Sequence, residues 1–433
     1  MPPRSLTEWL SRLEGLHPKE IDMGLSRVSR VASELDVLRP APLTFTVTGT
    51  NGKGSTCAAL VALLAQAGMR VGCYTSPHLV RYNERVDVAG ELASDEQLCR
   101  AFEAVDRVRG EVSLTYFEFG TLAALYLFKE AQLDAVVLEV GLGGRLDAVN
   151  VVDADVAVVT SIGLDHQEYL GDTRELVGFE KAGILRQGCP VVAGERDLPS
   201  SFIGEVQRLN AKLFQRGSQF DWSPGDDGQW AFHGLSPNGQ PRTLHDLPAV
   251  RLPRDNLSVA IQAFWAVGLE LSESLIRQAL RDAYVPGRLE WRTVSWLGQP
   301  RKVCLDVGHN PHAAGYLSAS LSHGNAPRRA VFGLLSDKDL AGVVEPLSGL
   351  FQCWAVTPLP SPRSRSAEEL AEHLIARGER VEQFQSVAEA LRDALDNTPA
   401  TTDIVIFGSF FCVADAILWL SENTQELTDG SRP

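Results

Sequence analysis

The chain has 433 residues, an apolar content of 44% and a formal charge of −15 at pH 7. A chain of this length can form two or three domains with substantial cores, and its negative charge argues against a nucleic-acid-binding protein, which normally has a basic surface. The start of the sequence lacks the apolar core of a secretion signal, and no apolar run reaches the roughly 20 residues that span a bilayer. We therefore expect neither export nor membrane insertion.

The seven cysteines occur singly, without any Cys-x-x-Cys pair. This spacing favours neither a disulfide framework nor a zinc site. It predicts a protein of the reducing cytoplasm.

Strand-like and helix-like segments alternate from the start of the chain. The strand-like segments are continuous β-branched and apolar runs, which are typical of strands covered on both faces. They lie at 43–49, 70–76, 134–141, 154–163 and 189–195, with helical patterns at 55–68, 117–133 and 173–185. This order predicts an α/β fold with a mostly parallel sheet.

The segment 214–250 breaks this alternation because it is rich in turn residues, and it predicts short hairpins at a sheet edge. Two helical stretches follow, at about 254–270 and 272–283, and Pro286-Gly287 then predicts a hinge. Beyond it the alternation restarts, which predicts a second, smaller α/β domain. Its strands are expected at 301–308, 328–335, 352–359 and 402–409, with helices near 312–323, 339–350, 366–378, 386–397 and 411–422.

The stretch VTGTNGKGST, residues 47–56, stands between a predicted strand and a predicted helix. Its glycines let the backbone approach a polyphosphate, and the helix N-terminus and Lys53 add positive charge. Ser55 and Thr56 are the hydroxyls nearest to a metal that would accompany the phosphates. The loop departs from the common pattern G-x-x-x-x-G-K-[ST], because Gly49 is too close to Lys53 and Gly54 replaces the hydroxyl. A plain glycine-rich turn with a solvent-exposed lysine is the alternative, but the strand–loop–helix context favours a phosphate loop.

Polar side chains end three other predicted strands: Ser76, Glu139 and the pair Asp165-His166. Ligands of open α/β sheets bind at the carboxyl ends of the strands, and oxygen ligands suit Mg²⁺. Taken singly, Glu139 could be a surface acid and His166 a structural histidine. Their occurrence together near a phosphate loop predicts a metal site.

Seven motifs, taken in order, resemble the Mur-ligase superfamily of ATP-dependent amide ligases, and within it the bifunctional bacterial dihydrofolate synthase/folylpolyglutamate synthases. They are TGTNGKGST, SPHL, LEVGLGGRLDAVN, SIGLDH, EKAGI, PGR and DVGHNPHA. In that superfamily the short glycine spacing and the glycine after Lys53 are the usual form of the loop. The resemblance implies a P-loop-type central domain (1–286) that binds ATP and the pterin or folate, and a smaller Rossmann-like glutamate-ligase domain (287–433).

The resemblance also implies which residues hold ATP and its metal. Those for ATP are Thr50, Asn51, Gly52, Lys53, Gly54, Ser55, Asn256, Arg288, Asp306, His309 and Asn310. Those for Mg²⁺ are Ser76, Glu139 and His166, and the resemblance leaves a second Mg²⁺ open. From the residues alone, Asn256 is an ordinary helix N-terminal residue and Arg288 an exposed linker charge. Gly308 stands where many relatives have alanine, a difference that we expect to be neutral.

Lys181 follows Glu180 in a predicted helix, where a solvent-exposed ion-pair face is the ordinary interpretation. The family carries a carbamylated lysine at this motif, in which carbon dioxide turns the amine into an anionic carbamate able to bind Mg²⁺. The resemblance therefore implies a catalytic role for Lys181, beside Lys53 and His166. The sequence does not decide whether this lysine is modified.

Two stretches are candidates for binding a pterin: GLHP (15–18) and LTYFEFGT (114–121). An aromatic face beside a hydrogen-bonding group suits a flat heterocycle, although Phe117 and Phe119 equally suit a helix core. The resemblance implies that dihydropteroate contacts Gly15, Leu16, His17, Pro18, Thr115, Tyr116, Phe117, Glu118, Leu146, Asp147 and Ala148.

The implied activity is the ligation of L-glutamate to dihydropteroate and to reduced folates, with ATP as the energy source and an acyl phosphate as the intermediate. We expect a cytoplasmic monomer that acts on small molecules. The alternatives are a monofunctional folylpolyglutamate synthase, a sister Mur-type amino-acid ligase, a P-loop kinase or NTPase, and a non-catalytic nucleotide-binding module. The GLHP and LTYFE stretches disfavour the sister ligase, and the intact Lys53, Glu139 and His166 disfavour the non-catalytic module.

Overall fold

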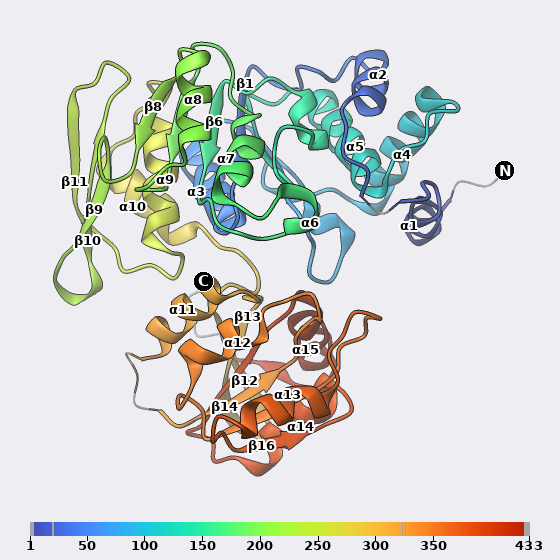
Figure 1. Cartoon of the computed structure of the whole chain (residues 1–433), viewed down its shortest axis with the longest axis vertical. Helices are drawn as coiled ribbons and strands as arrows, with labels where there is room; N and C mark the ends of the chain where they lie inside the picture. Colours follow the sequence, from blue (N-terminus) through green and yellow to red (C-terminus); the bar gives the residue numbers. More distant parts are fainter. Residues whose placement is uncertain (1–3, 20, 323, 325, 428–433) are drawn as a thin grey trace. The chain divides into compact units, whose positions relative to one another are not determined.

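The computed structural model describes residues 4–19, 21–322, 324 and 326–427 (Figure 1). The chain divides into two compact units, the first ending at Tyr284 and the second beginning at Val285. Within the described residues, no helix is long and apolar enough to cross a membrane.

The first unit is built on a sheet with the strand order β4-β3-β2-β5-β1-β6-β7-β8. Neighbouring strands from β2 to β8 run parallel, and β3 and β4 are antiparallel additions at one edge. The strands are β1 (Leu43–Thr48), β2 (Val71–Tyr74), β3 (Val86–Val88), β4 (Glu91–Leu92), β5 (Ala135–Glu139), β6 (Val156–Val159), β7 (Pro190–Ala193) and β8 (Lys212–Gln215). Because β1 lies between β5 and β6, the carboxyl ends of these three strands meet at one edge, where ligands bind in such sheets.

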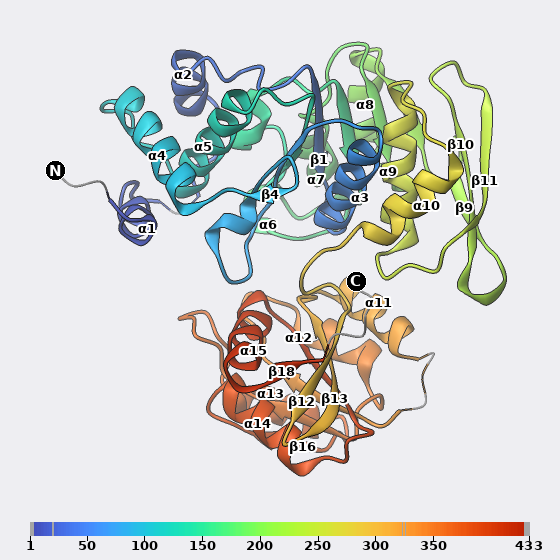
Figure 2. The same cartoon turned by 180° about the vertical axis from the view of Figure 1, so that it is seen from behind.

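Helices cover both faces of this sheet. The two opposite views show α3, α9 and α10 over one face and α7 over the other (Figures 1 and 2). The helices of this unit are α1 (Leu6–Glu14), α2 (Ser26–Glu34), α3 (Lys53–Gln66), α4 (Asp95–Arg109), α5 (Tyr116–Glu130), α6 (Gln167–Leu170), α7 (Arg174–Ala182), α8 (Ser200–Arg208), α9 (Arg254–Ala266) and α10 (Glu273–Asp282), with 3-10 turns η1 (Tyr82–Arg85), η2 (Ala148–Val151) and η3 (Asp226–Gly228). Helices α1, α4 and α5 pack around Trp9, Phe102 and Phe119, which belong to the main apolar core.

The turn-rich segment forms short antiparallel strands as expected, namely β9 (Asp221–Pro224), β10 (Trp230–Leu235) and β11 (Pro241–Leu247). They do not extend the edge of the large sheet, as the sequence predicted, but form a separate sheet with the order β11-β10-β9. This small sheet packs on α9, with the rings of Phe232 and Trp265 5.2 Å apart.

The second unit has the strand order β16-β15-β14-β17-β13-β12-β18. The strands from β16 to β13 run parallel, whereas β12 and β18 are antiparallel at one edge. Its elements are β12 (Glu290–Trp296), β13 (Gln299–Asp306), α11 (Pro311–Leu321), β14 (Arg328–Phe332), α12 (Leu340–Val344), η4 (Glu345–Leu347), β15 (Cys353–Val356), α13 (Ala367–Ile375), β16 (Val381–Gln383), α14 (Val387–Asn397), β17 (Asp403–Phe407), α15 (Phe410–Asn423) and β18 (Gln425–Glu426). A separate core forms around Phe332, Trp354 and Phe407. The mostly parallel α/β fold expected for both parts of the chain is confirmed.

Candidate active site

The glycine-rich loop joins β1 to α3 at the carboxyl edge of the first sheet. Gly52 has a φ of 87° and precedes the helix, so α3 begins at Lys53, two residues earlier than the sequence pattern predicted. No side chain caps this helix start, so its first backbone N–H groups and the positive end of the helix dipole are suited to binding an anion. The Lys53 Nζ donates to the carbonyl of Gly49 at 3.0 Å. Thr56 is fully buried, and Ser55 is also buried.

Asn256 lies against this loop. A Cβ added at Gly52 would be 2.4 Å from Asn256 Oδ1, so the absence of a side chain at 52 is what allows the approach. The structure thus places Asn256, at the first turn of α9, beside the loop with which the resemblance associates it.

The segment after β6 is joined to the glycine-rich loop by hydrogen bonds. The Thr50 N–H donates to the carbonyl of Ser161 at 2.9 Å, and the Asn51 N–H donates to Ser161 Oγ at 2.9 Å. The Thr50 hydroxyl donates to the carbonyl of Gly163 at 2.9 Å. Sequence reasoning missed Ser161, although a hydroxyl at the end of a predicted strand was a visible signal.

Two of the three expected metal ligands are in contact. The Ser76 N–H donates to Glu139 Oε2 at 3.1 Å, and Glu139, at the end of β5, pairs in register with Val47 just before the loop. Among the described residues, no group of three or more His, Cys, Asp or Glu side chains is gathered tightly enough to hold a metal alone. Mg²⁺ normally keeps waters and substrate phosphates among its ligands, so a carboxylate and a hydroxyl beside a phosphate loop fit this ion. His166 lies immediately before α6, has a φ of 49° and is exposed.

Lys181 is buried in α7 with 2% of its surface exposed, so the exposed ion-pair interpretation is wrong. Its neighbour Glu180 pairs instead with Arg145, at 2.8 Å. Burial, together with the charge of Lys53, lowers the pKa of Lys181 to about 7, against the attraction of nearby acids. A substantial fraction of this amine is therefore unprotonated near neutral pH.

Asp147 is a second buried residue whose pKa differs from its ordinary value. Burial raises the pKa of its carboxyl to about 7, although the N–H groups of Leu142 and Val149 donate to it at 2.8 and 3.0 Å. Ala148 follows as the first residue of η2 and is buried, and Leu146 is half-buried.

The LTYFE stretch forms the first turn of α5. Thr115 caps the helix, and the buried Glu118 accepts the Thr115 N–H at 2.8 Å. Phe117 is half-buried and lies over the loop after β5, because a Cβ at Gly141 would be 2.7 Å from its ring. Phe119 is fully buried, and the half-buried Phe117 packs against the same apolar core, so the core interpretation holds for Phe119 and in part for Phe117.

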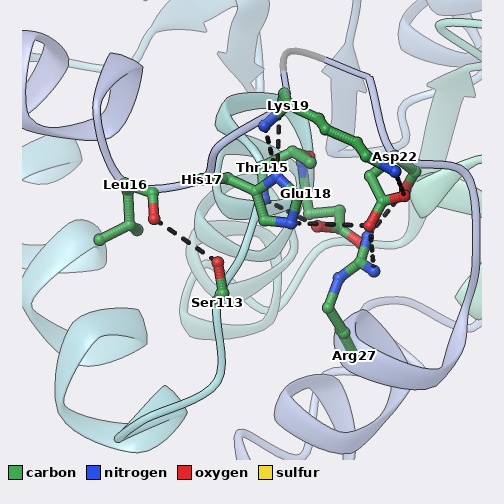
Figure 3. Close-up of polar contacts among 8 residues, drawn as sticks. All are labelled: Leu16, His17, Lys19, Asp22, Arg27, Ser113, Thr115 and Glu118. Carbon is green, nitrogen blue, oxygen red and sulfur yellow. Dashed lines mark hydrogen bonds and ion pairs between the residues drawn. The ribbon is translucent and has the colours of Figure 1, made fainter.

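The GLHP stretch is joined to the start of α5 by a charged network (Figure 3). His17 Nε2 lies 3.6 Å from Asp22 Oδ2, and Arg27 contacts both Asp22 and Glu118. Burial alone raises the pKa of Asp22, but the charges of Arg27 and Lys19 outweigh it and keep the pKa below its ordinary value. Sequence reasoning missed Asp22 and Arg27, although an acid and a base within the apolar stretch IDMGLSRV were the available signal.

In the second unit the PGR and DVGHNPHA motifs meet. Asp306, at the end of β13, is 6% exposed and accepts the N–H groups of Leu289 at 2.9 Å and Gly308 at 2.8 Å. Burial raises the pKa of Asp306, and the charge of Arg288 opposes this rise. The Val307 N–H donates to the carbonyl of Gly287 at 2.8 Å, which connects the two motifs.

The remaining residues of this group lie where α11 begins. His309 Nδ1 is 2.9 Å from the Val307 carbonyl, and its ring lies 6.1 Å from that of Phe410. Asn310 caps α11 by accepting the Ala313 N–H at 3.0 Å. A Cβ at Gly308 would be 2.6 Å from Asp306 Oδ1. Alanine at 308 therefore fits this chain only if the Asp306 carboxylate moves, which qualifies our expectation of a neutral difference.

Comparison with known proteins gives matches along nearly the whole chain. Residues 47–212 match the Mur ligase middle domain, and residues 287–410 match the Mur ligase glutamate ligase domain. The chain is 47% identical to the dihydrofolate synthase/folylpolyglutamate synthase of Escherichia coli K12, over 94% of each chain. It resembles the solved structure of E. coli FolC in complex with DHPP and ADP, with 46% identity and a TM-score of 0.90 over 97% of this chain and 98% of that one. A bifunctional folylpolyglutamate synthase/dihydrofolate synthase solved with Mn, AMPPNP and L-glutamate has 45% identity and a TM-score of 0.87, over 96% of this chain and 98% of that one.

Proposed function

We propose that this chain, which belongs to the Mur ligase family and within it to the dihydrofolate synthase/folylpolyglutamate synthases, is an ATP-dependent ligase of L-glutamate. Its acceptors are dihydropteroate, which gives dihydrofolate, and tetrahydrofolates, which give folylpolyglutamates. The observation that carries the proposal is the phosphate loop beside the Ser76–Glu139 contact, in a chain 46% identical to a relative solved with DHPP and ADP. A relative solved with AMPPNP and L-glutamate supports the other two substrates.

The reaction we propose activates a carboxylate, which is otherwise a poor electrophile because it is charged and its leaving group is oxide. The γ-phosphoryl group of ATP passes to a carboxylate oxygen, and ADP leaves. The amine of L-glutamate then attacks the carbonyl carbon of this acyl phosphate, loses a proton, and the C–O bond to phosphate breaks as the amide forms. Lys53 and the N-terminus of α3 stabilise the charge on the transferring group.

We propose Glu139, Ser76 and His166 as the residues that hold the divalent metal. When bound, the metal neutralises charge on the phosphates. A relative solved with Mn supports a divalent ion in this family.

For ATP we propose the loop residues from Thr50 to Ser55, with Asn256 from the first unit. From the second unit we propose Arg288, Asp306, His309 and Asn310. We propose that residues 1–286 form the domain that binds ATP and the pterin or folate, and residues 287–433 the glutamate-ligase domain; the two compact units and the two matched domains support this division.

For dihydropteroate we propose the stretches Gly15–Pro18, Thr115–Glu118 and Leu146–Ala148. The charged network between the first two, and the contact of Phe117 with the loop after β5, support a shared surface.

We also propose that Lys181 is carbamylated. A buried amine with a pKa near 7 is partly unprotonated at neutral pH, and the free amine is the form that reacts with carbon dioxide. The carbamate would supply oxygen ligands for a second Mg²⁺. Native mass spectrometry of the protein in bicarbonate buffer, compared with Lys181→Met, would reveal the adduct.

We further propose that the protein acts as a cytoplasmic monomer without a nucleic-acid partner. Its seven free thiols suit a reducing compartment, and its formal charge of −15 disfavours a polyanion.

The test is to incubate the protein with MgATP, L-glutamate and either dihydropteroate or tetrahydrofolate, and to weigh the products. We expect a gain of one glutamyl group on both acceptors. A gain on tetrahydrofolate alone would make the enzyme monofunctional, and ADP release without L-glutamate would indicate a kinase or NTPase. Lys53→Ala should lower turnover by about 100-fold or more with an unchanged circular dichroism spectrum, while the exposed Lys302→Ala should match the unaltered protein.

A further inference from the structure

Arg27, in the first turn of α2, links two stretches of the chain that lie far apart in the sequence (Figure 3). Its Nη1 donates to Asp22 Oδ2 at 2.5 Å, and its Nη2 donates to Glu118 Oε1 at 3.0 Å. The Nη2 also donates to the backbone carbonyl of Asp22 at 2.7 Å. One guanidinium therefore joins the segment before α2 to the first turn of α5, where Glu118 lies 91 positions after Arg27.

Each end of this link continues into a stretch proposed for dihydropteroate. The Asp22 carboxylate lies 3.6 Å from His17 Nε2, which belongs to the GLHP stretch. The other oxygen of Glu118 accepts the Thr115 N–H at 2.8 Å and so completes the cap of α5. A second, longer contact lies beside the link, where the hydroxyl of Ser113, two residues before the cap of α5, is 3.5 Å from the carbonyl of Leu16.

The burial of Glu118 makes the link energetically important. Its side chain is 5% exposed, whereas that of Arg27 is 27% exposed. A buried carboxylate that loses its cation must take up a proton or move toward water. Either response disturbs the cap of α5, which the same carboxylate completes.

Arginine is suited to this position because its planar group carries separate N–H donors for two carboxylates at once. A lysine ammonium can pair closely with either Asp22 or Glu118 but lacks this fork. The chemistry of the site therefore depends on the guanidinium and not on positive charge alone.

We propose that Arg27 is a positioning residue for dihydropteroate, which holds His17 and the first turn of α5 in one arrangement so that the two stretches form a single binding surface. This inference deepens the proposed function and rests on it.

The test uses the full-length protein and steady-state kinetics with dihydropteroate, MgATP and L-glutamate. For Arg27→Gln we expect the KM for dihydropteroate to rise about tenfold or more, with kcat and the other two KM values within about twofold. For Arg27→Lys we expect a smaller rise in the KM for dihydropteroate. Arg30→Gln is the matched control, because Arg30 lies one turn further along α2, is exposed and pairs only locally with Glu34 in the part of the chain described here.

An unchanged KM for dihydropteroate in Arg27→Gln would overturn the inference. A similar rise in all three KM values, together with a fall in kcat and a lower melting temperature, would also overturn it, since Arg27 would then only support the fold. If Arg27→Gln is insoluble, Arg27→Lys decides, and an unchanged KM for dihydropteroate would again contradict the inference. If the unaltered protein forms no amide with either acceptor, the proposed function itself fails, and the inference fails with it.

Discussion

Lys181 is a buried amine whose lowered pKa makes the free energy of unfolding depend on pH. The unfolded chain keeps a proton on Lys181 up to its ordinary pKa of 10.5, whereas the folded chain releases it near pH 7. Between these values the unfolded state holds more protons, so the free energy of unfolding should rise with pH. The destabilisation by Lys181 is complete below pH 7 and fades toward pH 10.5.

Denaturant unfolding in buffer free of carbon dioxide, at about pH 7 and about pH 10, would measure this effect. We expect the free energy of unfolding of the unaltered protein to increase relative to that of Lys181→Met, which lacks the titrating group. Parallel pH profiles for the two proteins would contradict the assigned pKa.

The candidate residues of the site were easier to predict from the sequence than the burial and contacts of their side chains. The loop, Ser76 and Glu139 could be proposed from the sequence because each follows a recognisable strand, and their roles stay predictions. The contact of Ser161 with the loop and the pairing of Arg27 with Glu118 were missed because each joins residues far apart in the sequence, and a pattern along the chain does not show such contacts. The burial of Lys181 was hidden for the same reason, since the loop after β5 that approaches its helix is distant in sequence.

At the scale of elements, the strands between helices were predictable, whereas edge strands were not. Buried parallel strands such as β5 and β6 show as unbroken apolar runs. The sequence EWRTVSW of β12 mixes polar and apolar residues, because this antiparallel strand lies near the edge of its sheet. The start of α3 was placed two residues late, because the pattern of side chains does not show that Gly52 has a positive φ.

The two ends of α3 provide a test of the phosphate loop. Gly52 and Gly68 both have positive φ, 87° and 80°, so alanine at either position costs about 1–2 kcal/mol of backbone strain. At Gly52 the new Cβ would also lie 2.4 Å from Asn256 Oδ1, whereas nothing lies within 4 Å at Gly68. We expect Gly52→Ala to raise the Kd for ATP about tenfold or more, through displacement of the loop and Asn256.

Calorimetry with a non-hydrolysable ATP analogue would compare the two variants. Gly68→Ala should lose similar stability but keep its affinity for the nucleotide. Equal affinities in both variants would show that the loop conformation seen here is not the one that binds ATP.

At the scale of the whole molecule, the chain consists of two units, each with a core of its own. The expected boundary at Pro286-Gly287 lies within two residues of the structural division after Tyr284, because a restart of the strand–helix alternation is visible in the sequence. The assignment of ATP and pterin to the first unit and of glutamate to the second stays a prediction.

The predicted hinge at Pro286-Gly287, here called the linker, should govern how well phosphoryl transfer is coupled to amide formation. An acyl phosphate exposed to water would hydrolyse before the amine attacks it. Gly287 has a φ of 67°, and its N–H donates to Glu290 Oε2 at 2.7 Å, so Gly287→Ala strains the linker where the chain enters the second unit. We expect this variant to release more ADP per amide formed and to have a lower kcat for ligation.

Gly298→Ala is the control, because Gly298 has a φ of 79° in the turn between β12 and β13, with nothing within 4 Å of a new Cβ. Parallel assays of ADP and of glutamylated product give the ratio, and the same ratio in both variants would show that coupling does not depend on the linker.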